Sequence, residues 1–170
     1  MKFIVNRKEM YNAVRKALKT ASPVNDIVIT EGVLIEADAD KNIVSVICTD
    51  LRTRIMCMVR AQSVTESGSM ILKPIVCSML KLLDGETAEF YTDSLNRNEV
   101  NIKSGRAIYT VPFKEASEFP TVPTPYPQDM ICIEGINHLI KRTAFAAEDK
   151  QVDGNQKILQ FVNLRFNGSA

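Results

Sequence analysis

The chain begins with a pattern that it later repeats, and this repeat limits its possible folds more than any other feature. Met1–Val5 is a short apolar segment typical of a strand, and it leads directly into Arg7–Lys19, whose apolar residues recur at helical spacing. The same order returns with a strand-like segment at Met130–Ile133 and a helix-like segment at Ile136–Ala147. A strand and a helix that recur after about one domain length indicate tandem copies of one module.

The segments that follow the two helices also match each other. Apolar residues recur at one shared spacing, at Ile29, Val33 and Ile35 in the first copy and at Ile158, Val162 and Leu164 in the second. We therefore expect a strand after each helix. A chain of 170 residues has room for one complete module and about 40 residues of another, near the size at which a piece rarely folds without support. We interpret the second copy as interrupted near Phe166–Ala170.

Between the two copies, the pattern predicts short strands and one more helix. Strands are expected at Val24–Glu36, Lys41–Thr49, Arg52–Arg60, Gly68–Leu72, Thr87–Thr92, Glu99–Lys103 and Ala107–Val111, and a helix at Lys73–Leu83. Arg52–Arg60 alternates with a period of two, which indicates a half-buried strand. Most connections have hairpin length, so the sheets should be antiparallel. The predicted fold class is therefore α+β, with two helices packed on antiparallel sheets in the order β-α-β-β-β-β-α-β-β-β, repeated in tandem.

A proline-rich stretch marks the expected domain boundary. Phe113–Gln128 contains four prolines, at Pro120, Pro123, Pro125 and Pro127. Such a segment cannot continue a helix or a sheet and behaves as a semi-rigid connector. We predict a first domain at residues 1–120, a linker at 121–128 and the incomplete start of a second domain at 129–170.

The charge and the hydropathy of the chain argue against a polycationic, a secreted or a membrane-spanning protein, and its cysteines against a disulfide framework. The formal net charge is +1, so any nucleic-acid binding must depend on where the charges lie rather than on their sum. Met1 enters a strand pattern directly, without a signal peptide, and no apolar run is long enough to span a membrane. Cys48, Cys57, Cys77 and Cys132 are scattered through apolar segments and form no CxxC pair. This pattern favours free thiols in a cytoplasmic protein.

Basic residues follow the predicted helices on the side opposite to the apolar residues. A helix turns 100° per residue, which places Lys8, Asn12, Arg15 and Lys19 within about 40° of one line. The other helices contribute Lys73, Lys81, Lys141 and Arg142. A single basic stripe is most often a solvated helix face. Here, however, acidic residues gather in loops and strands instead, at Asp38, Asp40, Glu66, Asp84, Glu86, Glu89, Asp93, Glu115 and Glu118. A surface that faces phosphates needs this segregation.

The sequence offers little for catalysis. The chain has one histidine, His138, and it has no Gly-rich phosphate loop, HExxH motif or nucleophile elbow. Asp50 lies at a turn, where an aspartate normally accepts hydrogen bonds from its own backbone. We therefore expect a non-catalytic protein that uses no metal and no cofactor.

Several short motifs together resemble one known family. They are Met1-Lys2-Phe3-Ile4-Val5, Cys48-Thr49-Asp50-Leu51, Ile102-Lys103-Ser104-Gly105-Arg106 and Glu118-Phe119-Pro120. Their order and spacing are similar to those of the first domain of bacterial sliding clamps, the β subunits of DNA polymerase III. His138–Ala146 resembles the helix that opens the second domain of these clamps.

This resemblance implies a ring around double-stranded DNA that confers processivity on the replicative polymerase. The ring would be a head-to-tail homodimer of three-domain subunits, with helices lining the hole and sheets outside. Lys8, Arg15, Lys19, Lys73, Lys81, Lys141 and Arg142 would then face phosphates. The pocket that such clamps use for DNA polymerase III and the clamp loader lies between the second and third domains, mostly outside this chain. The loop Thr20–Asn25 lacks the arginine with which many members of the family touch DNA.

Two other interpretations are compatible with the residues alone. One is a small-molecule-binding or enzymatic α+β domain whose basic helices are merely solvated. The other is an interaction scaffold in which Pro120–Pro127 serves as a docking peptide, although Tyr126 is the sole aromatic residue among these prolines.

Overall fold

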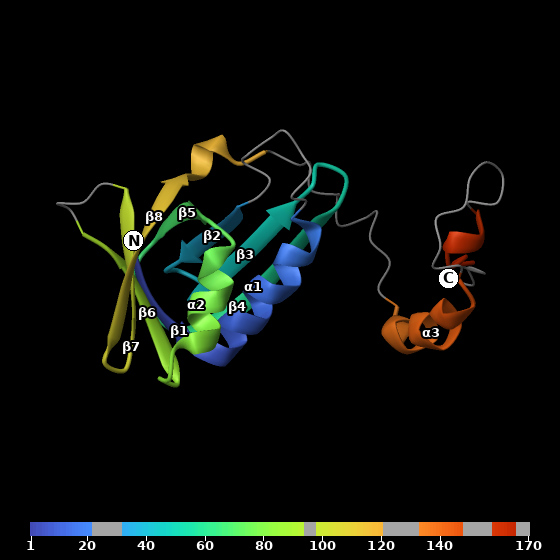
Figure 1. Cartoon of the computed structure of the whole chain (residues 1–170), viewed down its shortest axis with the longest axis horizontal. Helices are drawn as coiled ribbons and strands as arrows, with labels where there is room; N and C mark the ends of the chain where they lie inside the picture. The colour runs from blue at the N-terminus through green and yellow to red at the C-terminus, as the bar shows by residue number, and fades with distance from the viewer. Residues whose placement is uncertain (22–31, 94–97, 121–132, 148–157, 166–170) are drawn as a thin grey trace. The chain divides into compact units, whose positions relative to one another are not determined.

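The computed structural model of the chain consists of two compact units, Met1–Pro123 and Thr124–Ala170 (Figure 1). It describes residues 1–21, 32–93, 98–120, 133–147 and 158–165. The predicted linker at 121–128 and the predicted strand residues Met130–Cys132 lie outside these ranges. The boundary between linker and domains therefore stays a prediction.

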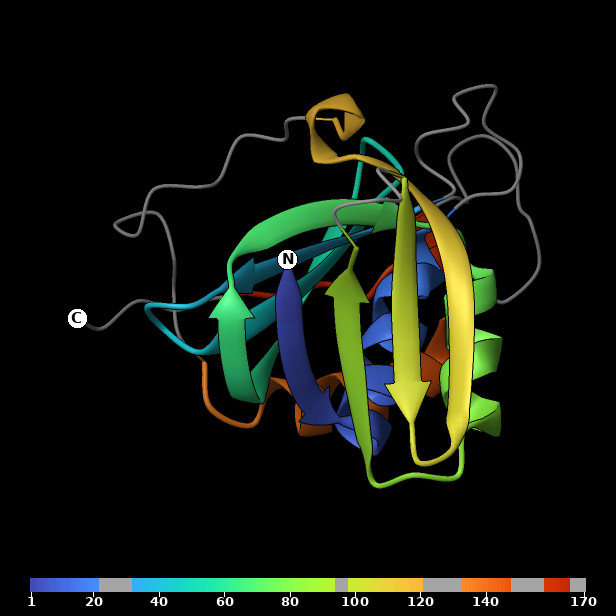
Figure 2. The same ribbon diagram turned by 90° about the vertical axis from the view of Figure 1, so that its left-hand side faces the viewer.

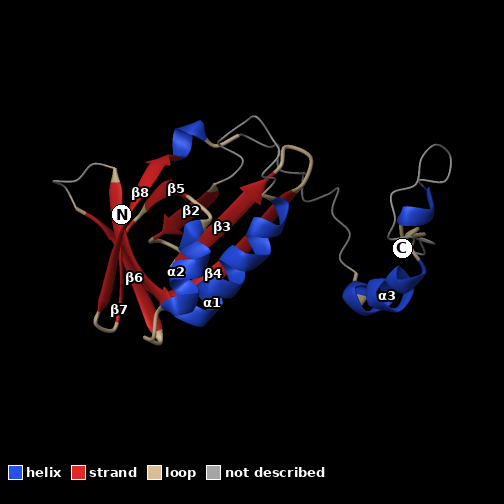
Figure 3. Cartoon of the chain, in the orientation of Figure 1, coloured by secondary structure: helices blue, strands red, loops and turns tan. Residues whose placement is uncertain are grey.

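The described residues of the first unit form eight strands and two α-helices. Figure 3 shows the strands in red and the helices in blue. In chain order they are β1 (Lys2–Asn6), α1 (Arg7–Ala17), β2 (Val33–Asp38), β3 (Ile43–Thr49), β4 (Arg54–Glu66), β5 (Gly68–Leu72), α2 (Ile75–Leu82), β6 (Thr87–Thr92), β7 (Glu99–Ser104) and β8 (Ala107–Glu115). The predicted α+β class and the predicted order of elements are confirmed.

The strands form one closed antiparallel barrel in the order β1-β4-β3-β2-β5-β8-β7-β6, with β6 pairing back onto β1. Closure depends on two long strands that change partners along their length. Arg54–Arg60 of β4 pairs with β3, and the part from Ala61 onward pairs with β1. In the same way, β8 pairs first with β7 and then with β5. Figure 2 shows β1, in dark blue, beside β6, with which it closes the barrel.

The barrel order shows that the first unit is itself built from two similar halves. The segment β1-α1-β2-β3-β4 is followed by β5-α2-β6-β7-β8. Within each half the strands lie in the same order, because β1-β4-β3-β2 corresponds to β5-β8-β7-β6. The junctions also correspond: β2 pairs with β5, and β6 pairs with β1. The sequence analysis found the repeat between units but not this shorter one.

Alternation and helical periodicity explain how these elements share one core. Every second residue of the strands points inward, and Phe3 and Phe90 stack at 4.7 Å between ring centroids. Asn6 caps the start of helix α1, and its side-chain oxygen accepts hydrogen bonds from the N–H groups of Lys8 and Glu9. The helix buries Met10, Ala13, Val14 and Ala17 in the same core. The core therefore holds both helices against the barrel.

The two helices lie side by side (Figure 1) and run in opposite directions. Arg7, at the start of α1, joins them at one end. Its guanidinium donates to the carbonyl of Leu80 at 2.9 Å and to that of Gly85 at 2.6 Å. The Leu80 carbonyl lies in the last turn of α2, where a positive charge is favoured, and Gly85 follows the helix. Arg7 thus satisfies helix-end acceptors that would otherwise lack a partner.

The outer face of the barrel confirms one expectation and corrects another. The alternation of Arg52–Arg60 places the arginine and methionine side outward, with Met56 and Met58 exposed. Strand β8 runs on to Glu115, beyond the predicted Val111, because Phe113–Glu115 pairs with β5. The predicted connector from Phe113 onward was therefore wrong in its first residues. After β8, Ala116 and Phe119 cover a second apolar cluster formed by Leu34, Ile47 and Ile71.

The second unit contains α3 (Ile136–Thr143), which continues as a 3-10 turn over Ala144–Ala146. This agrees with the predicted helix Ile136–Ala147. The strand predicted from Ile158, Val162 and Leu164 was wrong, because within the described residues 158–165 the chain forms a 3-10 turn and then no regular structure. A strand needs neighbouring strands to bond its backbone. In this unit the described residues include none, and no residue of α3 is buried.

We predict that Arg7→Met lowers the free energy of unfolding of the chain by about 2 kcal/mol, because hydrogen bonds from a charged donor contribute about 1.5–3 kcal/mol each. The free energy is measured by urea denaturation. The matched control is Lys8→Met, one residue away and exposed, which should change stability by about 0.5 kcal/mol or less. Equal effects of the two substitutions would contradict the structural role of Arg7.

Candidate nucleic-acid interface

Helix α1 presents a basic face to solvent. Lys8, Asn12, Arg15 and Lys19 are all exposed, on the side opposite to the buried apolar residues. This agrees with the periodicity of the sequence. Lys19 lies in the 3-10 turn Leu18–Thr20 that extends the helix, so the face continues past the end of α1.

Helix α2 adds fewer charges than α1. Lys73 precedes the helix and Lys81 lies in its last turn, and both are exposed. The exposed side of α2 also carries Ile75 and Leu82, which are 51% and 72% exposed. The surface of the two helices is therefore basic along α1 and at the ends of α2, rather than uniformly basic.

Cys77 of α2 is partly buried, and charges of both helices act on its thiol. Burial raises the pKa of this thiol, whereas the positive charges of Arg15 on α1 and Lys81 on α2 act in the opposite direction. The guanidinium of Arg15 lies over the ring of Tyr11, at 5.7 Å from the ring centroid.

Two basic residues of α1 were not among the predicted site residues. Lys16 is exposed and lines a shallow hollow of about 310 Å³ together with Asn12 of α1 and Met58 of β4. Its position beside Lys8 and Arg15 in the sequence could have identified it. Arg7 instead donates to the carbonyls of Leu80 and Gly85. Its role is therefore structural.

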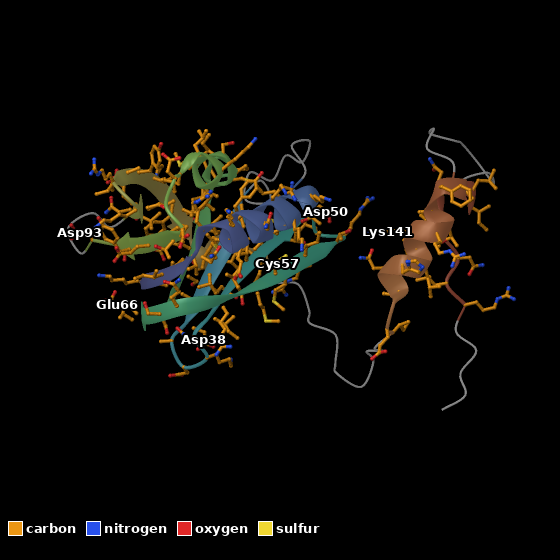
Figure 4. All side chains as sticks on the ribbon, turned by 90° about the horizontal axis from the view of Figure 1, so that it is seen from below. Asp38, Asp50, Cys57, Glu66, Asp93 and Lys141 are labelled. Atoms are coloured by element: carbon orange, nitrogen blue, oxygen red, sulfur yellow. The ribbon has the colours of Figure 1, made fainter. Side chains whose placement is uncertain are left out.

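Ion pairs within the described residues lie on strands and turns, away from the helices of the first unit. Lys2 pairs with Glu89, Lys41 with Asp38, Lys114 with Glu118 and the terminal amine with Glu66. Figure 4 labels Asp38, Glu66 and Asp93, which lie at strand ends or directly after them. In the part of the chain that the structure describes, no carboxylate pairs with the basic side chains of α1 or α2. These cations are therefore available to an external anion.

Lys141 and Arg142, the last two predicted phosphate contacts, lie on α3 in the second unit and are exposed (Figure 4). The five predicted residues of the first unit thus lie on or directly beside α1 and α2, and the other two lie on the second unit. Beside α3, an apolar hollow of about 390 Å³ is lined by Leu139, Ile140 and Phe161 among others.

Two candidate reactive residues, Asp50 and Cys48, have structural surroundings. Among the described residues there is no group of three or more His, Cys, Asp or Glu side chains that could hold a metal ion. Asp50 accepts hydrogen bonds from the N–H groups of Arg52 and Thr53, which lower its pKa, as expected for a turn residue. Burial raises the pKa of Cys48 to about 12, which leaves this thiol unreactive. None of the described helices is long and apolar enough to cross a membrane.

Comparison with known proteins identifies a family and a set of similar structures. The family model of the DNA polymerase III beta subunit, N-terminal domain, matches residues 1–123. The structure is similar to a DnaN sliding clamp (DNA polymerase III subunit beta) from Pseudomonas aeruginosa bound to griselimycin, with a TM-score of 0.74 and 20% identity. It is also similar to a DNA polymerase sliding clamp from Bacillus subtilis, with a TM-score of 0.69 and 23% identity.

Both alignments cover 89% of this chain but 41% of the other. A third structure, the DNA polymerase III beta subunit from Thermotoga maritima, has a TM-score of 0.66 and 21% identity over 74% of this chain and 33% of its own. The chain therefore spans less than half the length of these proteins. No curated protein matches its sequence.

We predict that Arg15→Gln slows the reaction of Cys77 with a disulfide reagent at pH 8. Removing the positive charge raises the pKa of the thiol further, so less of it is the reactive thiolate. The rate is measured by absorbance in a Cys57→Ser, Cys132→Ser background. Lys19→Gln, on the same face of the helix, is the matched control and should leave the rate unchanged. A rate that does not distinguish the two variants would show that Arg15 does not lie beside Cys77.

Proposed function

Because this chain belongs to the family of the DNA polymerase III beta subunit, we propose that it forms part of a sliding clamp. The clamp is a ring that encircles duplex DNA and keeps a replicative polymerase on its template. The chain supplies one clamp module and the start of a second, and a head-to-tail dimer closes the ring. The family match removes the support for a generic ligand-binding or enzymatic domain.

The observation that carries this proposal is the set of exposed, carboxylate-free cations on α1 and α2. A ring that slides must attract the phosphate backbone without reading bases, since base contacts would stop it at particular sequences. Scattered Lys and Arg side chains on a pair of helices meet this requirement. Lys8, Arg15, Lys19, Lys73 and Lys81 are the proposed contacts on the first unit, and Lys141 and Arg142 those on the second.

In this proposal the protein does no chemistry on DNA. Its partners are duplex DNA, a second copy of the clamp subunit, a DNA polymerase III and the clamp loader that opens the ring. The residues described here provide surface charge and a rigid scaffold, and retention on DNA depends on topology rather than on tight binding.

We predict that the chain binds short duplex DNA weakly and without sequence preference, and that its affinity falls steeply with salt. Replacing one of the five cations of the first unit by alanine should lower the slope of log affinity against log salt by about one at most. The measurement is fluorescence anisotropy at several salt concentrations. Lys103→Ala, on β7 away from α1 and α2, should leave the slope unchanged. A wild-type affinity that is independent of salt would contradict the proposed surface.

We also predict that the polypeptide carrying this chain, once placed on a circular plasmid by its clamp loader, stays bound for as long as the circle is closed. Cutting the plasmid once should release it, because a ring slides off a free end. Retention is measured by gel filtration of the DNA before and after cleavage. Equal retention on circular DNA and on linear DNA with free ends would exclude a ring.

A further inference from the structure

The terminal amine of Met1 is a charged group outside the proposed DNA-facing surface, and the fold binds it at several points. It donates to a carboxylate oxygen of Glu66 at 3.2 Å and to the hydroxyl of Thr92 at 3.0 Å. The carbonyl of Met1 accepts the N–H of Thr92 at 3.1 Å. Glu66 ends β4 and Thr92 ends β6, the two strands that flank β1. Met1 therefore joins both neighbours of β1 at the point where this strand begins.

The side chain of Met1 is also held in place. It is 4% exposed and packs against the main core. It lies against Gly68, the first residue of β5, where an added Cβ would come within 2.9 Å of the Cβ of Met1. The packing of the side chain thus sets the position of the amine, in addition to the contact with the exposed Glu66.

The partners of this nitrogen match an ammonium group and do not match an amide. A hollow of about 480 Å³ at this end of the barrel is lined by Lys2, Glu66, Tyr91, Thr92 and Asp93. Figure 4 labels Glu66 and Asp93 there. An ammonium group has a positive charge and three N–H donors, whereas an acylated nitrogen is neutral and has one. One donor cannot serve both the carboxylate of Glu66 and the hydroxyl of Thr92.

We propose that the amine of Met1 is a modification-sensitive site, and that an acyl group on this nitrogen weakens the attachment of β1 to β4 and β6. The group would be a formyl or an acetyl group in amide linkage. Its removal is an amide hydrolysis: water adds to the carbonyl, the C–N bond breaks, the acid leaves as a carboxylate and the nitrogen becomes an ammonium. This class of reaction supplies the group that Glu66 and Thr92 bind.

The test compares the thermal unfolding of three forms of the whole chain. The first has a free amine at Met1, the second keeps a formyl group because it is produced in cells whose deformylase is inhibited, and the third carries Gly-Ser before Met1. Mass spectrometry verifies the state of Met1 in each preparation. Both blocked forms should unfold about 2–6 °C lower, because a charge-assisted hydrogen bond is lost. Gly-Ser added after Ala170 is the matched control and should leave the midpoint unchanged.

A substitution at Glu66 tests whether the amine acts through this carboxylate. Glu66→Gln should lower the midpoint of the free-amine form by about 1–2 °C, since Glu66 is exposed and such ion pairs are weak. It should have no further effect in the formylated form. Glu36→Gln, which changes an exposed carboxylate on β2, is the matched control and should act equally in both forms.

Hydrogen exchange provides a local measurement. The N–H of Thr92, which donates to the Met1 carbonyl, should exchange about tenfold faster in the formylated form, because this end of β1 opens more often. The N–H of Arg7 donates to the carbonyl of Glu86 directly after the other end of β1. Its exchange should be unchanged.

Equal midpoints and equal Thr92 exchange in the free and formylated forms would overturn the inference. It would also be overturned if Glu66→Gln lowered the midpoint of the formylated form as much as that of the free form. None of these measurements involves DNA, so the inference and the sliding-clamp proposal can fail independently.

Discussion

The arrangement of the first unit depends on the packing of α1 and α2 into the core that they share with the strands. The apolar face of α1 buries Met10, Ala13, Val14 and Ala17, and α2 buries Val76 and Leu80. With these faces fixed, the opposite sides of both helices must face solvent together. The basic surface is a consequence of this packing, since every cation on it lies where the core does not.

Arg7 fixes the relative direction of the two packed helices. Arg7 holds the start of α1 to the end of α2 through two backbone carbonyls. The helices therefore run antiparallel. A buried apolar interface alone would allow the helices to slide along each other, whereas hydrogen bonds to named carbonyls allow one position. Arg7 therefore has a structural role, whereas Arg15 lies on the exposed face of α1.

The cations on the strands and turns differ in their partners from those on α1 and α2. On the strands and turns, cations such as Lys2 and Lys41 have carboxylate partners. Exposed pairs of this kind contribute little to stability. They neutralise part of the charge on the strands and turns, whereas the cations of α1 and α2 have no carboxylate partner among the described residues. A net charge of +1 is therefore compatible with a phosphate-facing surface.

The sequence by itself determined the α+β class, most elements of the first unit and the basic face of α1. These depend on local periodicity, which separates the buried side of Arg7–Ala17 from its exposed side before any partner is known. It predicted a strand at Ile158–Leu164 wrongly, because a strand exists only where neighbouring strands bond its backbone. Tertiary structure alone decided the closure of the barrel through β4 and β8, and the correspondence of its two halves. It also decided that α1 and α2, far apart in the sequence, lie side by side. Which helices pack side by side depends on the core that they share, and residue spacing along the chain does not predict it.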